Sequence, residues 1–323
     1  MSNSVAEKFS LKDHLFNADT VGQLAAEFAV GVPNFDAARF SEQALAGFAE
    51  RELMARMEWM ADCLEEQLAG DFEVMANQLE AAMPVQLDLS KDDDDFRHFI
   101  HCVHGILTAR HGLEAHRVRA MTVLYQATQR FSTEFYIRHF LNRWPDETFA
   151  ELTAWAVDGN YHVHRLVSEG TRPRLPWAQN VGLVPEQTLP LLDVLHADGA
   201  RFVARSVANH LNDLSKVVPD AVLARLAQWE VTGRQNAKEL DWMKRHALRT
   251  LIKQGHAGAM AALGYAVDVP VEAQIALVSD TVPMGGALGI EITLTAMSLC
   301  LCWWITVSAL RGLQVNHRKK CSS

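Results

Sequence analysis

One segment near the middle of the chain concentrates charged and aromatic side chains between prolines. Its sequence is Ser168-Glu-Gly-Thr-Arg-Pro-Arg-Leu-Pro-Trp-Ala178. The two prolines end the helix that precedes them, because proline lacks an amide hydrogen and clashes with the preceding turn. Arg172, Arg174 and Trp177 then lie on a stiff, extended segment. Two guanidinium groups and an indole on such a loop can clamp a phosphate backbone and face a base. The alternative is a linker whose tryptophan packs in the core.

A carboxylate stands beside this loop. Glu169 lies in the last turn of the helix that ends at Gly170. The helix dipole disfavours negative charge at this end, so a structural reason for Glu169 is lacking. Forty residues later the chain runs Arg205-Ser-Val-Ala-Asn-His-Leu-Asn-Asp213. Polar residues recur here at every fourth position, which places them on one face of the helix.

The same face recurs along the chain and predicts one polar surface. Its members are Arg165, Glu169, Arg205, Asn209, Asp213, Arg245, Arg249 and Lys253. A polar stripe of mixed charge on one face of a helical solenoid is a usual binding surface. A plain solvated face would have a similar composition, so both interpretations remain open at this point.

A repeat of about 40 residues must position this surface. Arg165, Arg205 and Arg245 are spaced by 40, and apolar residues keep step two positions before and two positions after each arginine. Apolar helices precede two of the units, and turn segments follow at 213–219 and 255–258. A period of about 40 with two helices per unit is typical of HEAT-like repeats. Together with abundant Ala, Leu, Glu, Arg and Met, it predicts an all-α solenoid.

Charge is distributed unevenly along the 323 residues. The formal net charge is −9, which would argue against a nucleic-acid partner if it were uniform. Residues 1–159 carry 13 Lys and Arg against 26 Asp and Glu, whereas residues 160–260 carry 13 against 9. An anionic partner is therefore expected at the middle segment, where the repeat and the arginine-rich loop lie.

The cysteines bear on the cellular compartment. The chain has five, an odd number, and no Cys-x-x-Cys pair. This is no disulfide framework, so we expect a reducing, cytoplasmic environment. The first 13 residues lack a basic region followed by an apolar run, and no signal peptide is expected.

These motifs resemble a known family. The loop motif at 168–177, the helix at 205–213 and the run Lys244-Arg-His-Ala-Leu-Arg-Thr-Leu-Ile-Lys253 are similar to the AlkC branch of the AlkC/AlkD DNA glycosylases. The resemblance covers roughly residues 10–290. It implies a HEAT-like superhelix whose concave face grips damaged duplex DNA, and excision of 3-methyladenine-type and 3-methylcytosine-type bases without full base flipping.

The resemblance also implies which residues act. The catalytic carboxylates would be Glu134, in Ser132-Thr-Glu-Phe-Tyr136, then Glu169 and Asp213, with Trp177 beside the lesion. These residue types suit the chemistry. A cationic alkylated base leaves readily, and carboxylates stabilise the oxocarbenium-like sugar and orient water. The expected partner is alkylated duplex DNA, the expected state is a monomer, and no metal or organic cofactor is required.

Two rival functions remain open. A non-catalytic HEAT-like scaffold would bind structured or damaged DNA, or a protein. A metal-dependent helical hydrolase would use a histidine cluster, whose members are His98, His101, Cys102, His104, His111 and His116. The spacing of i, i+3, i+6 drifts around a helix, and no firm ligand motif such as His-Glu-x-x-His is present. We therefore expect no metal site.

The C-terminal part departs from the helical pattern. We expect a glycosylase domain over 1–266 and an incomplete, immunoglobulin-like β segment with an anomalous tail over 267–323. Alternation at Val267–Val271 and Gly289–Leu294 predicts strands. Back-translation of Cys302-Trp-Trp-Ile-Thr306 in another frame yields Leu-Val-Asp and then Tyr, so our hypothesis is that the chain beyond about Met297 is out of frame. The alternative is a tail anchor, because 292–310 is uncharged; our expectation is no membrane association.

Overall fold

The computed structural model describes residues 9–91, 99–265, 271–279, 281–286 and 288–296. In this part of the chain the elements are α1 Leu11–Leu15, α2 Ala18–Gly31, α3 Ala37–Ala46, α4 Leu53–Glu65, α5 Phe72–Ala81, the 3₁₀ turn η1 Phe99–His101, α6 Cys102–Gly112, α7 Arg117–Thr128, α8 Glu134–Arg143, α9 Pro145–Trp155, α10 Tyr161–Gly170, α11 Pro185–Leu195, α12 Arg201–Leu214, α13 Pro219–Thr232, α14 Ala237–Ala247, α15 Arg249–Lys253, α16 Ala257–Ala262, β1 Val271–Leu277 and β2 Ile290–Ala296.

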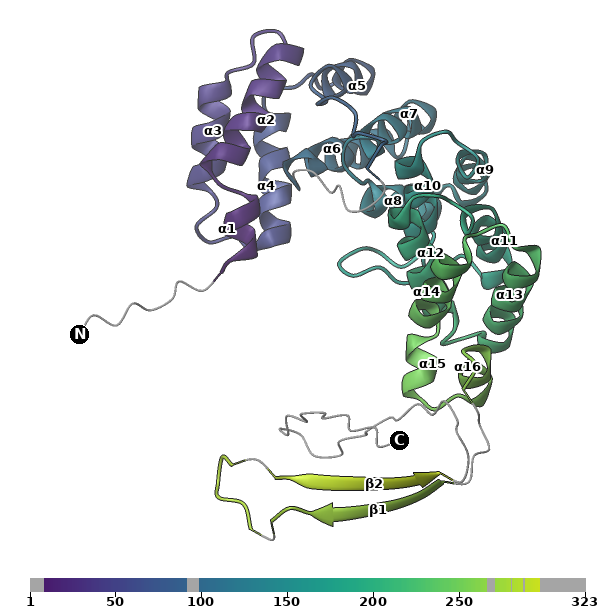
Figure 1. Cartoon of the computed structure of the whole chain (residues 1–323). Coiled ribbons are helices and arrows are strands. Elements are labelled where there is room, and N and C mark those ends of the chain that lie inside the picture. Colours follow the sequence, from purple (N-terminus) through teal and green to yellow (C-terminus); the bar gives the residue numbers. More distant parts are fainter. Residues whose placement is uncertain (1–8, 92–98, 266–270, 280, 287, 297–323) are drawn as a thin grey trace.

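The helices form a curved arc of two rows (Figure 1). In the inner row α4 packs against α6, α6 against α8, α8 against α10, α10 against α12, and α12 against α14. Helices α5, α7, α9, α11 and α13 lie along the outer side of the arc (Figure 1). The all-α helical-repeat architecture expected from the sequence is therefore confirmed.

The 40-residue period corresponds to successive inner helices. Val163, Val203 and Met243 precede the three repeated arginines by two positions and are fully buried in α10, α12 and α14. The apolar residues two positions after each arginine are also buried. Each inner helix thus buries its apolar face against its neighbours, which is how a solenoid builds a continuous core.

Local signals set where these helices begin and end. The Asn160 side chain accepts a hydrogen bond from the His162 amide and caps α10. Pro185 and Pro219 occupy the first positions of α11 and α13, where a missing amide hydrogen costs nothing. Gly233 ends α13 with φ of +60°, a conformation that glycine adopts without strain.

One of the two expected turns differs from the sequence-based expectation. The turn expected at 213–219 is shorter, because α12 continues to Leu214 and keeps Asp213 in its last turn. The run 244–253 spans two helices, since α14 ends at Ala247 and α15 begins at Arg249. The turn at 255–258 is confirmed, with Gly255 at φ of +71° between α15 and α16.

The β segment is a two-stranded antiparallel sheet beyond the helical arc (Figure 1). Strand β2 confirms the strand expected from Gly289, and it pairs with β1 in the register Val271 to Ala296 and Leu277 to Ile290. Strand β1 begins at Val271, and the remainder of the stretch expected at 267–271 lies outside the described residues. The boundary at 266/267 and the chain from Met297 lie outside the described residues.

In the described parts of the chain, no helix combines the length and apolar character that crossing a membrane requires.

Candidate active site

Three neighbouring helices of the inner row bring together the three carboxylates predicted from the sequence. Glu134 lies in the first turn of α8, Glu169 in the last turn of α10 and Asp213 in the last turn of α12. Because α10 packs between α8 and α12, residues up to 79 positions apart in the chain meet on one side of the arc.

Two arginines join these carboxylates in a chain of ion pairs. Arg165 Nη1 donates to Glu134 Oε2 at 3.0 Å, and Arg165 Nη2 lies 3.8 Å from Glu169 Oε1. Arg172 Nη1 donates to Glu169 Oε2 at 2.8 Å, and its Nη2 donates to Asp213 Oδ2 at 2.7 Å. The three acids are therefore held at one place by shared guanidinium groups.

A third cation and a hydroxyl complete the chain. Lys216 Nζ donates to Asp213 Oδ1 at 3.0 Å at one end, and Arg165 Nη1 also donates to Ser132 Oγ at the other end. Three carboxylates thus face three cations, and the six side chains together carry no net charge. We name these six residues the carboxylate cluster: Glu134, Arg165, Glu169, Arg172, Asp213 and Lys216.

Burial and ion pairing act in opposite directions on the cluster. Burial alone would raise the pKa of Glu134, but Arg165 and hydrogen bonds from Ser132 and Arg165 outweigh it, and this pKa is lowered. Burial would lower the pKa of Arg165 and Arg172, yet the neighbouring carboxylates raise both. Glu134 is therefore a carboxylate, not a carboxylic acid, at neutral pH.

The helix dipole would destabilise two of the three carboxylates if these cations were absent. The C-terminal end of a helix carries partial negative charge, so Glu169 and Asp213 are disfavoured there. Arg172 contacts both of them, which offsets the repulsion. Glu134, at the N-terminal end of α8, lies where the dipole favours a carboxylate.

Buried hydrogen bonds fix α10 against α12 beneath the cluster. Ser206 Oγ donates to Ser168 Oγ at 2.8 Å, and His210 Nδ1 donates to the Ser168 carbonyl at 3.0 Å. His210 is fully buried, and burial followed by the nearby Arg172 lowers its pKa to about 3. A neutral His210 with its proton on Nδ1 therefore links the helices that carry Glu169 and Asp213.

Close packing places α10 beside α8. A Cβ added to Gly170 would lie 2.6 Å from Ile137 Cγ2 on α8. Glycine at the end of α10 thus allows the approach that lets Arg165 reach Glu134.

Trp177 lies on the loop 171–184, which follows α10 and extends toward the inner side of the arc (Figure 1). The tryptophan is 73% exposed and adopts a φ of +63°, a conformation that costs energy for a residue with a side chain. A large apolar side chain held out in solvent by a strained backbone is a feature of ligand sites. The structure places Trp177 on the loop but describes no contact between it and the three carboxylates.

The other predicted DNA-binding residues have different environments. Arg174 is exposed on the same loop, and Lys253 is exposed at the end of α15. Asn209 Oδ1 accepts hydrogen bonds from Arg249 Nη2 at 3.0 Å and from His246 Nε2 at 2.8 Å. Burial, then Arg249 and other arginines, lowers the pKa of His246 to about 4, so it donates as a neutral ring.

Exposure of the three repeated arginines increases along the arc. Arg165 is buried in the carboxylate cluster, Arg205 is half-buried beside Phe202, and Arg245 is exposed and paired with Asp241 at 3.1 Å. The sequence repeat therefore does not give them equivalent surroundings. Arg201, Arg205 and Arg249 are nevertheless close enough together that all three lower the pKa of His246.

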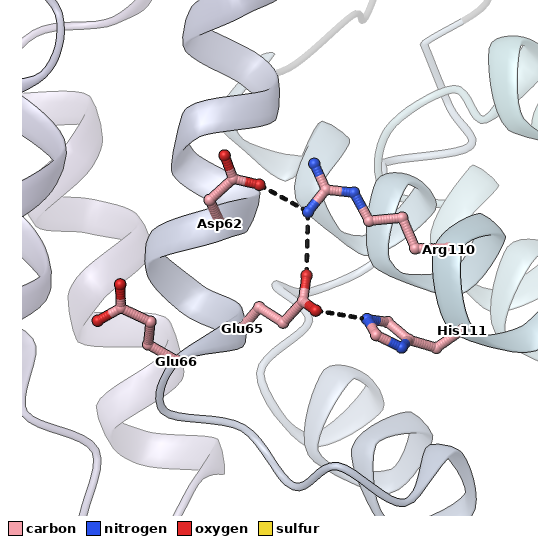
Figure 2. A pocket seen from close by; sticks show the side chains of 5 residues that line it. All are labelled: Asp62, Glu65, Glu66, Arg110 and His111. Atoms are coloured by element: carbon pink, nitrogen blue, oxygen red, sulfur yellow. Dashed lines mark hydrogen bonds and ion pairs between the residues drawn. The ribbon is translucent and has the colours of Figure 1, made fainter.

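A separate pocket opens between α4 and α6, on the acidic N-terminal part of the arc (Figure 2). Asp62, Glu65, Glu66, Arg110 and His111 line it. Arg110 Nη1 lies 2.7 Å from Asp62 and 3.0 Å from Glu65, while His111 Nε2 lies 3.0 Å from Glu65 (Figure 2). Asp62 and Glu65 face Arg110 and His111, whereas Glu66 points away from them and pairs with Arg39. With three carboxylates in its lining, this pocket is unsuitable for a phosphate backbone.

The histidines weighed as metal ligands make other contacts. His101 Nε2 lies 2.8 Å from Glu27 Oε2, and His104 Nδ1 donates to the His101 carbonyl at 3.1 Å. His116 lies 3.1 Å from Glu73. In the regions that the structure describes, which exclude His98, no group of three or more His, Cys, Asp or Glu side chains is arranged to hold a metal ion.

Sequence reasoning missed Arg138 and Lys216. Arg138 is fully buried on α8 and donates to carbonyls of the loop 171–184 and of Gly170. No sequence pattern marked it, because its partners are backbone atoms more than 30 residues away. Lys216 follows Asp213 by three positions, a helical spacing that could have indicated the pair.

Comparisons with known proteins place this geometry in context. No family model matches the chain. The uncharacterized protein YhaZ of Bacillus subtilis strain 168 is 33% identical over 259 residues, which cover 78% of this chain and 67% of that protein. The structure of Pseudomonas fluorescens alkylpurine DNA glycosylase AlkC, bound to DNA containing an abasic site analog, superposes with a TM-score of 0.71. It is 30% identical, covering 90% of this chain and 87% of that chain. AlkD2 from Streptococcus mutans gives a TM-score of 0.33 at 17% identity, which is too low to support an argument.

Proposed function

This chain belongs to the family of the alkylpurine DNA glycosylase AlkC, and we propose that it hydrolyses the N-glycosidic bond of cationic alkylated bases in DNA. The proposed substrates are lesions of the 3-methyladenine and 3-methylcytosine type in duplex DNA, and the proposed role is base excision repair. The proposal includes recognition without full base flipping.

The carboxylate cluster is the observation that carries the proposal. It lies on the inner row, where the arc can follow a duplex, and the loop bearing Trp177 extends from the same helix as Glu169. A scaffold that only binds DNA has no need of three carboxylates gathered at the base of a loop that carries an exposed tryptophan. An enzyme that stabilises a cationic sugar does need them.

The chemistry is a substitution by water at the sugar carbon C1′. The electrons of the glycosidic bond pass to the alkylated base, which leaves as a neutral molecule because it carried a positive charge. The sugar becomes oxocarbenium-like, and Glu169 and Asp213 stabilise this charge electrostatically. Water then bonds to C1′ and loses one proton, which a carboxylate of the cluster accepts. Trp177 would hold the cationic base against its π face.

The contacts of Arg165 and Arg172 refine their proposed roles. Both were expected to bind DNA phosphates, and both donate to carboxylates of the cluster. We propose that they chiefly hold the carboxylates in place. Arg174, Arg205, Arg245, Arg249 and Lys253 remain the proposed phosphate contacts, together with Asn209.

The test is release of methylated bases from alkylated duplex DNA, without added metal, by the purified protein. Release of N-methylated bases at a rate far above the spontaneous one supports the proposal. A matched control is the double variant Glu169→Gln with Asp213→Asn, which should bind DNA and release little base. If the wild-type protein binds DNA tightly and releases no base, the enzyme proposal is wrong and the scaffold alternative is favoured.

A further inference from the structure

Arg138 is a buried cation whose described hydrogen bonds all go to backbone carbonyls. Its Nη1 donates to the Gly170 carbonyl at 2.9 Å and to the Arg172 carbonyl at 2.8 Å. Its Nη2 lies 3.4 Å from the Pro173 carbonyl, and its Nε donates to the Gln179 carbonyl at 2.5 Å. One guanidinium group therefore binds both ends of the segment 170–179.

This arrangement requires arginine. Only a planar guanidinium presents several donors in a fixed fork, so one side chain can hold two chain segments in one geometry. Burial, then repulsion from Arg172, lowers the pKa of Arg138 to about 10, which still leaves it charged at neutral pH. Burying a charge is unfavourable, and this cost is offset here by the carbonyl dipoles.

The loop held by Arg138 carries two parts of the proposed site. Between the clamped ends lie Arg174 and the exposed Trp177. Arg172 is held by its backbone and by its side chain. Its carbonyl accepts a hydrogen bond from Arg138, while its guanidinium group contacts Glu169 and Asp213. Displacement of the loop would therefore move both the tryptophan and the carboxylates.

Neighbouring residues of α8 extend the same contact. Asn142 Nδ2 donates to Gln179 Oε1 at 3.1 Å and to the Asn180 carbonyl at 3.0 Å, and Gln179 Nε2 lies 3.0 Å from His139 Nδ1. Helix α8 also begins with Glu134. One helix thus carries a carboxylate of the cluster and the clamp for the loop of Trp177.

We propose that Arg138 is a positioning residue that sets Trp177 and Arg172 relative to the carboxylates, so that base excision depends on it although it does not touch DNA. The inference rests on the proposed glycosylase function. It predicts a larger defect in the chemical step than in DNA affinity, because Arg174 is the one proposed phosphate contact on the loop and those on α12, α14 and α15 do not depend on it.

The experiment compares Arg138→Ala and Arg138→Lys with Arg143→Ala. Arg143 lies on the same helix but is half-exposed and pairs with Glu114 at 2.9 Å, so it is a matched control. Single-turnover base release should fall about 10²-fold in both Arg138 variants, since misplacement of a reacting geometry by about 1 Å costs this much. The dissociation constant for duplex containing an abasic-site analogue should rise by less than about tenfold, which is what loss of the single phosphate contact at Arg174 would cost.

A second measurement does not require activity. The Arg174–Leu175 bond lies inside the clamped loop and is a trypsin site, whereas Arg172 precedes proline and resists trypsin. Loss of the clamp should raise cleavage at Arg174 by about tenfold or more, because cleavage follows the population of the open loop. Asn142→Ala, which removes no buried charge, should raise it in the same direction by less, and millimolar guanidinium should partly restore base release by Arg138→Ala.

Each outcome decides between alternatives. The inference is supported if base release falls much more than DNA affinity, cleavage at Arg174 becomes faster and guanidinium restores base release. Arg138 variants that equal Arg143→Ala in base release overturn it. Cleavage at many sites without selectivity for Arg174, together with unchanged cleavage in Asn142→Ala, would also overturn it, because Arg138 would then serve only global stability. Base release absent from the wild-type protein would refute the proposed function, and selective cleavage at Arg174 would still report the clamp.

Discussion

Replacing Glu169 with glutamine isolates one charge while preserving shape. Glu169 lies between Arg165 and Arg172, and glutamine retains an oxygen that can accept from Arg172. The three carboxylates of the cluster balance its three cations, so the substitution leaves one excess positive charge. This excess charge lies beside the sugar that becomes positively charged in the proposed reaction.

The expected magnitude follows from Coulomb's law. A carboxylate about 5 Å from the developing charge, at an effective dielectric of about 20, contributes about 3 kcal/mol to transition-state stabilisation. This corresponds to a rate reduction of about 10², within the range of 10²–10³ typical for loss of one preorganised electrostatic group. Removing the buried charge should also lower the free energy of unfolding by about 1–3 kcal/mol, because a charged hydrogen bond becomes neutral.

DNA affinity should not fall together with the rate of base release. An excess positive charge on the inner side of the arc attracts phosphates, so binding should be unchanged or slightly tighter. The assay is single-turnover release of methylated base, with affinity measured on duplex containing an abasic-site analogue. Glu186→Gln, an exposed residue in the first turn of α11, is the matched control and should leave both values unchanged.

Two results would refute this reasoning. Base release by Glu169→Gln within about twofold of wild type would show that the carboxylate does not stabilise the transition state. A parallel loss of affinity and rate would show that the substitution disrupts the DNA-binding surface rather than the chemistry.

Four further predictions test other features. Arg174→Ala should lower the slope of log affinity against log salt by about 0.9, as loss of one phosphate contact does, and an unchanged slope would place DNA elsewhere. Trp177→Ala should slow base release by about tenfold without lowering the melting temperature, since the indole is 73% exposed; a lower melting temperature would indicate a packing role instead. Burial lowers the pKa of His210 to about 3, so on acidification this histidine takes up a proton in the unfolded chain before it does so in the folded one. His210 should therefore lower the free energy of unfolding by about 1.4 kcal/mol as the pH falls from 7.5 to 5.5. His210→Gln should lose that part of the pH dependence in urea unfolding, and full retention would contradict the assignment. A chain ending near residue 267 should keep its helical circular dichroism, because the repeats bury their core between neighbours; capture of a soluble reporter fused to 292–323 by membranes would refute the out-of-frame hypothesis and favour a tail anchor.

The inner row of helices was predictable from the sequence because its signals are local. Apolar residues around Arg165, Arg205 and Arg245 recur at the period of a buried helix face, and each faces the next helix of the solenoid. Capping residues and prolines likewise act within one turn. The boundary that differed, at 213–219, depends on how the last turn of α12 packs, which no local pattern specifies.

The residue types of the site were also identified from the sequence, through one motif and a resemblance. Glu169 was marked by its unfavourable position at the end of a helix, and Asp213 by its place on the equivalent face one repeat later. In the structure, Arg165 and Arg172 join Glu169 and Asp213 to Glu134 through ion pairs. Their roles in catalysis remain predictions.

Only the tertiary structure decided which charges pair. In sequence, Arg165 and Arg172 cannot be distinguished from arginines that bind phosphates, because their partners lie 31 and 41 residues away on other helices. The same holds for Arg138, whose partners are carbonyl groups that carry no side-chain signature. The spacing of apolar residues along the chain is a property of the sequence, and it determined the helical repeat. The pairing of the buried charges depends on how closely α8, α10 and α12 approach one another. Only the folded arrangement of these helices brings the arginines within hydrogen-bonding distance of their carboxylates.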